Sequence, residues 1–159
     1  MLNLLRIFVN LCLLRAKPQD LPAAPALTAA ALVAYIAVGL GLSLPDLGFG
    51  RALLWAVLDT LVIVLLTHGA LLLRHFPERL QQTLTALLGS GALLGLVAWP
   101  IIGTQNSIVQ LVLLLWNLAV VAHILRHALS VPLGLSIIVS FGYFLVELTV
   151  GMVLAPTQS

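Results

Sequence analysis

The chain has 159 residues, of which 62% are hydrophobic and 8% are charged, and its mean hydropathy is +1.18. A typical soluble domain carries about 25% charged residues, so too few charges remain here to solvate the surface of a water-soluble domain. With its recurring apolar runs, the composition predicts an integral membrane protein. The net charge of +2 gives no ground for nucleic-acid binding, and the single cysteine excludes an internal disulfide.

The chain begins with an amphipathic segment, residues 2–15. Asn3, Arg6 and Asn10 recur at helical spacing, and most of the apolar residues fall on the other side. A helix of about 14 residues is too short to cross a hydrocarbon core of about 30 Å, so we expect it to lie flat on the membrane surface. The cations lie within and after the apolar run, which argues against a cleaved signal peptide. A proline-rich connector completes a cytoplasmic-face region, residues 1–23.

Five apolar segments of about 20 residues follow, which is the length that a spanning helix needs. The predicted fold class is an all-α polytopic membrane bundle, residues 24–154, with five transmembrane helices and the N-terminal interfacial helix. The spans are placed at 24–44, 52–73, 80–102, 108–129 and 133–154, before a short tail at 155–159. The separators carry the expected helix breakers Pro45, Gly48, Gly50, Pro77, Gly103 and Pro132. If "SVP" at 130–132 is a kink instead of a turn, the count becomes four.

The basic residues indicate the orientation. With five spans and the N-terminus inside, six of the seven Lys and Arg are cytoplasmic, as the positive-inside rule requires, and only Arg51 is outside. The cytoplasmic set is Arg6, Arg15, Lys17, Arg74, Arg79 and Arg126. We therefore expect a protein of a bacterial-type inner membrane with its N-terminus in the cytoplasm and its C-terminus outside.

A polar cluster is predicted within the outer half of the bundle. Asp59 and Glu147 each lie seven residues from the outer end of their span, and Tyr35 and Asn117 approach the same depth. Tyr143 belongs to a stripe on the fifth span that also contains Ser136, Ser140, Glu147 and Gly151. In the third span, Gly91 and Gly95 have the spacing that lets two helices approach closely.

A carboxylate that faces lipid costs at least about 2.5 kcal/mol, so both acids are expected to face the bundle interior. No Lys or Arg lies at their depth, and we expect one or both to be protonated. Three interpretations stay open: interhelical hydrogen bonding, a proton or cation relay, and an interface at which a partner supplies the missing cation. An intramembrane aspartyl protease is disfavoured, because "LDTL" and "VELT" lack the glycine-rich loops of such enzymes.

The sequence contains no motif for catalysis or for a cofactor. "HILRH" places His123 and His127 one helical turn apart, where they are weak candidates for a metal site. The zinc-protease pattern needs Glu after the first histidine, and this chain has Ile124. We expect histidines at the membrane interface, no metal and no cofactor.

Two stretches resemble the Yip-domain family of small polytopic membrane proteins. They are "RLQQTLTALLGSGALLGLVAWPI", residues 79–101, and "LLLWNLAVVAHILRHAL", residues 113–129, within a five-span topology that covers residues 24–154. The resemblance implies a non-enzymatic protein that acts through membrane partners. The long acidic N-terminal region of the eukaryotic members is missing, so a trafficking role does not carry over.

The sequence thus favours a non-catalytic subunit or assembly factor that contacts membrane lipids and binds another membrane protein or a second copy of itself. The alternative is a small proton- or cation-coupled carrier that uses Asp59 and Glu147.

Overall fold

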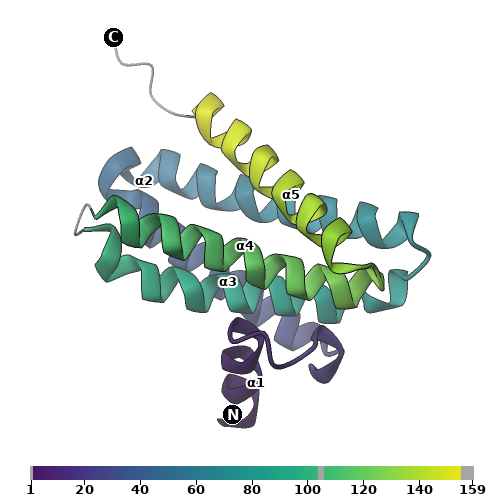
Figure 1. The fold of residues 1–159 in the computed structure, drawn as a ribbon. Coiled ribbons are helices and arrows are strands. Elements are labelled where there is room, and N and C mark those ends of the chain that lie inside the picture. Colours follow the sequence, from purple (N-terminus) through teal and green to yellow (C-terminus); the bar gives the residue numbers. More distant parts are fainter. Residues whose placement is uncertain (1, 104–105, 155–159) are drawn as a thin grey trace.

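The computed structural model describes residues 2–103 and 106–154, and these residues contain helices and no strands (Figure 1). The predicted tail at 155–159 lies outside the described residues. The α-helices are α1 (Leu2–Cys12), α2 (Pro25–Leu73), α3 (Leu80–Ile102), α4 (Ser107–Leu129) and α5 (Leu133–Leu154). Two short 3-10 helices, η1 (Pro18–Asp20) and η2 (Pro77–Arg79), each begin at a proline of a connecting segment. The prediction of an all-helical chain is confirmed.

Four helices are long and apolar enough to cross a membrane, judged by length and composition: α2, Pro77–Ile101, α4 and Leu133–Met152. With 49 residues, α2 is about twice as long as one crossing needs. Inside it, Gly48 has φ 70° and ψ 163°, a conformation that glycine adopts without steric cost. The two halves of α2 fold back on each other there, so that a Cβ on Gly39 would lie 3.5 Å from the Cβ of Ala56.

The separator expected at residues 45–51 is almost entirely helical, and Gly48 alone departs from helical geometry. Pro45 lies inside the helix. Because it is three residues from the break, its missing N–H removes only one hydrogen bond near the end of the first half. Glycine, and not proline, therefore makes this turn.

The N-terminal helix is shorter than predicted. It ends at Cys12, because Leu14 adopts a left-handed conformation with φ 60° and the backbone N–H groups of Arg15 and Ala16 both donate to the carbonyl of Asn10. In Figure 1, α1 projects crosswise from the long helices. It packs against the middle of α3, where Phe8 lies against Gly89, and the indole of Trp116 donates to the Cys12 carbonyl over 3.1 Å.

The other helix ends follow the sequence closely. Asn106 caps α4, since its side-chain oxygen accepts from the N–H groups of Ile108 and Val109. At the far end, Ser130 is left-handed with φ 53°, and α5 folds back along α4, so that Ser140 Oγ donates to the Leu118 carbonyl over 3.0 Å. The connection at 130–132 is therefore a turn and not a kink.

We call the two ends of the helical assembly the Arg79 end and the Gly48 end. The Arg79 end contains the connections at 74–79 and 130–132, and the Gly48 end contains the break in α2, the end of α3 and the start of α4. Most of the buried core lies toward the Arg79 end, where the fully buried side chains include Leu11, Leu21, Leu71, Leu88, Ile124 and Leu125. This end holds the fold together, and the Gly48 end is more open.

Candidate functional site

The hairpin in α2 brings Tyr35 opposite Asp59. The hydroxyl of Tyr35 donates to Asp59 Oδ2 over 2.8 Å, and both side chains are half-buried. Tyr35 and Asp59 are nearly the same number of residues from Gly48 along the chain. The turn at Gly48 therefore brings them opposite each other in the two antiparallel halves of α2.

Glu147 on α5 faces the same region. With Asp59 and Tyr35 it lines a cavity of about 490 Å³ between α2 and α5. Glu147 makes no hydrogen bond within the described part of the chain. Its carboxyl group is therefore available to a ligand.

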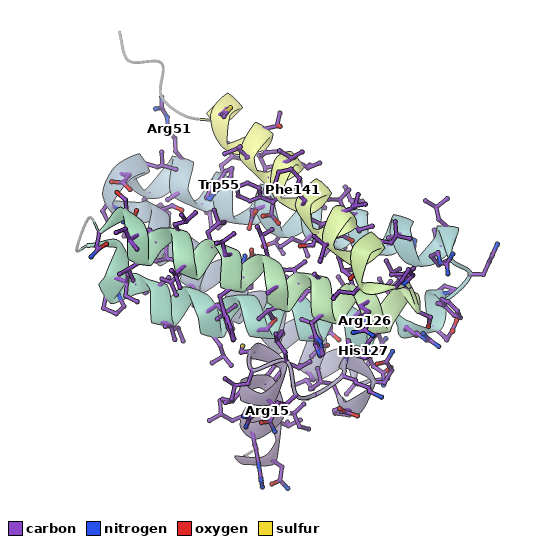
Figure 2. All side chains as sticks on the ribbon, in the orientation of Figure 1. Arg15, Arg51, Trp55, Arg126, His127 and Phe141 are labelled. Atoms are coloured by element: carbon purple, nitrogen blue, oxygen red, sulfur yellow. The ribbon has the colours of Figure 1, made fainter. Side chains whose placement is uncertain are left out.

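Trp55 and Gly151 shape this cavity. Figure 2 shows the Trp55 side chain in the space between α2 and α5. A Cβ on Gly151 would lie 2.9 Å from the indole ring, so the glycine makes room for it. The sequence placed Gly151 on a helical stripe but gave no indication of its contact with Trp55.

Asn117 on α4 connects two smaller cavities. One, of about 310 Å³, is also lined by Tyr35 and Asp59, and the other, of about 50 Å³, by Tyr35 and Glu147. Asn117 has no hydrogen-bond partner among the described residues. The structure thus gathers Tyr35, Asp59, Asn117 and Glu147 around neighbouring cavities, and Tyr35 lines all three.

Tyr143 lies beside this group but bonds elsewhere. It lines the smallest cavity with Glu147, and its hydroxyl donates to Thr67 Oγ1 over 3.3 Å. Ser140, one turn along α5, donates to a backbone carbonyl. These hydroxyls are committed to helix packing, so the residues available to a ligand are the two acids and Asn117.

The site is acidic and lacks a counter-charge. None of the residues that line the three cavities is Lys, Arg or His. Two carboxylates in a poorly hydrated cavity are costly unless they share a proton or gain a cation. The arrangement can therefore bind a proton, a cation or the cationic group of a partner.

Gly91 and Gly95 of α3 lie against the first half of α2. A Cβ on Gly91 would come within 2.6 Å of the Tyr35 ring, and one on Gly95 within 2.6 Å of Val38. The absence of side chains here lets Tyr35 reach Asp59.

The predicted basic residues lie apart from the acids. Arg79 donates to the Ala128 carbonyl over 3.1 Å and to Ser130 Oγ over 2.9 Å, and Arg74 donates to the Leu129 carbonyl. Arg126 ends α4 at the same end, and Arg15 and Lys17 lie on the connector beside it. Arg6 is exposed on α1. The capping of α4 by Arg79 was not foreseen, since an arginine near a helix start gives no signal for it.

His123 and His127 do not form part of a larger ligand cluster. Their rings meet edge to face with centroids 4.7 Å apart, and His123 Nε2 lies 2.9 Å from the Ala16 carbonyl. Over residues 2–103 and 106–154, no group of three or more His, Cys, Asp or Glu could hold a metal ion. Burial raises the pKa of the Cys12 thiol, which favours its neutral form.

Comparisons with protein-family models, with curated proteins and with solved structures gave no match for this chain.

Proposed function

We propose that the chain is a non-catalytic integral membrane protein that binds a second membrane protein within the bilayer, and that a Lys or Arg on the partner's transmembrane helix pairs with Asp59 and Glu147. One observation carries the proposal: the two carboxyl groups, on α2 and α5, line one cavity of about 490 Å³ that has no basic residue in its lining. A cation from a partner offsets the cost of placing such groups in hydrocarbon.

The proposal includes five crossings, made by the two halves of α2 and by α3, α4 and α5. The Arg79 end then faces the cytoplasm of a bacterial-type cell and the acid cavity lies in the outer half. The charge distribution supports this orientation, because Lys17, Arg74, Arg79 and Arg126 lie at or near one end. Membership of the Yip-domain family is part of the same proposal and rests on the sequence resemblance alone.

The rim of the cavity supports a helix as the occupant. Met152 and Leu148 border it and are 67% and 42% exposed, and Trp55 and Phe144 complete an apolar surround. A partner helix can cover this apolar rim and insert one cationic side chain toward the acids. A free metal ion would use the carboxylates but would leave the rim uncovered.

The test combines charge removal with site-specific crosslinking. A photoreactive residue at Met152 is expected to give one defined adduct with a membrane protein, and the double variant Asp59→Asn with Glu147→Gln is expected to lose it. The matched control is Asp46→Asn, which removes an exposed carboxylate at the Gly48 end outside the cavity. A photoreactive residue at Val33, exposed on the first half of α2, serves as the positional control.

Charge exchange at the partner's basic residue is the deciding test. Replacing it with Glu is expected to abolish the adduct, and Asp59→Lys in this chain is expected to restore it. An adduct that persists in the double variant contradicts the proposal. So does a partner that still forms the adduct after every Lys and Arg in its transmembrane helix has been replaced.

A second function, a small proton- or cation-coupled carrier, is favoured by one feature. The Tyr143 hydroxyl donates to the Thr67 hydroxyl, and both side chains are buried. Together they form a short polar path that leads from the cavity beside Glu147 into the packed interior. In liposomes, a carrier would show pH-dependent flux that Glu147→Gln abolishes and Asp46→Asn leaves intact. Absence of flux in the purified protein rejects this alternative.

A further inference from the structure

A fourth cavity lies on another side of the molecule, between α4 and α5. Its volume is about 670 Å³, and its walls are almost entirely apolar, formed by residues such as Leu115, Ala119, Ile137 and Phe141. Leu14 of the N-terminal segment contributes to its lining. The groove shares Leu118 and Ser140 with the smallest cavity of the candidate site, but neither Asp59 nor Glu147 lines it.

The polar groups of the groove gather toward the Arg79 end. His123 and Arg126 lie in its lining there, and Figure 2 places Arg126 near that end of α4 while Phe141 lies farther along α5. The guanidinium of Arg126 is exposed and makes no hydrogen bond or ion pair with any described residue. It is therefore a free cation at one end of an apolar groove.

Further positive charge lies close by. His123 Nε2 contacts the Ala16 carbonyl and Gln19 donates to the His127 carbonyl, which brings Lys17 to the same region. The nearest acid on this connector, Asp20, accepts a hydrogen bond from the backbone N–H of Lys17 over 2.7 Å. The mouth of the groove thus has two cations, Arg126 and Lys17, and one acid, Asp20, and its net charge is positive.

We propose that this groove binds one anionic phospholipid, with an acyl chain between α4 and α5 and the phosphate on Arg126, near Lys17. Basic pockets between transmembrane helices at the cytoplasmic side bind anionic headgroups, and guanidinium pairs well with phosphate. The apolar walls of the groove match an acyl chain, and the free cation at its end matches the phosphate of a lipid headgroup. The inference rests on membrane insertion with the Arg79 end at a headgroup layer, and it does not depend on the acid pair.

The experiment measures lipid retention by native mass spectrometry of the detergent-purified chain, with phosphatidylglycerol and phosphatidylcholine of identical acyl chains. The wild-type chain is expected to bind one phosphatidylglycerol at least tenfold more tightly than phosphatidylcholine. Arg126→Gln is expected to lose most of that preference, because a hydrogen bond to a charged group contributes enough for a roughly tenfold or greater change in affinity. The control Arg51→Gln removes an exposed arginine at the Gly48 end and is expected to change nothing.

A second variant tests the groove itself. Ile137→Trp fills it from an exposed position on α5 and is expected to reduce binding of both lipids, with the elution volume of the protein unchanged. Equal retention of the two lipids, or an Arg126→Gln variant that keeps the preference, overturns the proposal. Displacement of the lipid by millimolar inorganic phosphate also overturns it, because that result assigns the site to the phosphate group alone. The double variant Asp59→Asn with Glu147→Gln is expected to keep the lipid, which separates this proposal from the proposed function.

Discussion

The two ends of the helical assembly differ in how they are packed. At the Arg79 end, α3 is buried continuously from Thr83 to Ser90, and α4 contributes Val120, Ile124 and Leu125 to the same core. At the Gly48 end, no residue of α5 beyond Tyr143 is buried among those described. The two larger cavities around Tyr35 extend in this direction, whereas the smallest one borders the core at Leu87 and Ser90. The difference indicates that one end supplies stability while the other carries the site.

Side-chain size accounts for much of this difference. The buried face of α3 near the Arg79 end is built from small residues, including Thr83, Thr85, Ala86 and Ser90, which allow α1, α2 and α4 to pack closely around one helix. Toward the Gly48 end, Figure 1 shows α5 diverging from α4. Without α5 to fill it, the space between the helices remains as cavities.

The largest effect is expected from shortening a core side chain at the Arg79 end. Leu88 is 0% exposed and Leu96, two turns along the same helix, is 51% exposed. Leu88→Ala is expected to lower the free energy of unfolding by about 2–5 kcal/mol, because it removes packing and leaves a cavity. Leu96→Ala is the matched control and is expected to change it by less than about 0.5 kcal/mol. Denaturation of the purified protein in mixed micelles measures both, and equal losses would contradict the division into two ends.

A smaller loss is expected from adding a methyl group beneath the site. Gly91→Ala places a carbon within 2.6 Å of the Tyr35 ring, whereas a Cβ on Gly142 meets nothing within 4 Å. Overpacking of this kind costs about 1–3 kcal/mol. Gly142→Ala is expected to be neutral or stabilising because alanine favours a helix. The same unfolding experiment distinguishes them, and a neutral Gly91→Ala would show that Tyr35 has room to move.

The third prediction concerns Arg79, which caps α4 and lies with its guanidinium carbon 4.2 Å from the centre of the Phe76 ring. Arg79→Met is expected to cost about 1.5 kcal/mol or more, the net contribution of hydrogen bonds to a charged group. Arg79→Lys keeps the charge and is expected to recover part of the loss. Arg51→Met, at the Gly48 end, is the control. An equal loss in that variant would show that the loss in Arg79→Met does not come from capping α4.

The sequence predicted the helices well because apolar runs and breaking residues determine them. The predicted span 80–102 coincides with α3, and α4 begins one residue before the predicted start because Asn106 caps it. The sequence placed a break at residues 45–51 and named Gly48 among the breaking residues, but it did not show that the helical geometry would continue up to that single glycine on both sides. It also gave no indication that α1 crosses the middle of α3, because that contact depends on the small size of Gly89.

Hydropathy could not separate buried from exposed apolar side chains. In α4, Leu115 is 57% exposed and Leu125 is 0% exposed, although both are leucines in an evenly apolar helix. In a membrane both environments favour leucine, so the pattern that reveals a buried face in a soluble helix is lost. Polar residues were more informative. Counting residues from the helix ends gave Asp59 and Glu147 a common depth, and the structure places both in one cavity. The contacts of Trp55 and the apolar groove between α4 and α5 depend on the path of α5, which no local sequence pattern predicts.

The smallest effect is expected from Tyr35→Phe, which removes the 2.8 Å hydrogen bond to Asp59 and keeps the ring against Gly91. Interhelical hydrogen bonds in membrane proteins contribute about 0.6 kcal/mol on average, because the unfolded helices find other partners in the membrane. The expected loss is therefore close to that value. Tyr143→Phe is the control, since its hydroxyl bonds Thr67 at the buried side of the same region. A loss above about 2 kcal/mol for Tyr35→Phe alone would mean that the Gly48 end holds the fold together through its polar contacts. In that case Asp59 would be committed to structure, and the cavity would have only Glu147 left to offer a partner.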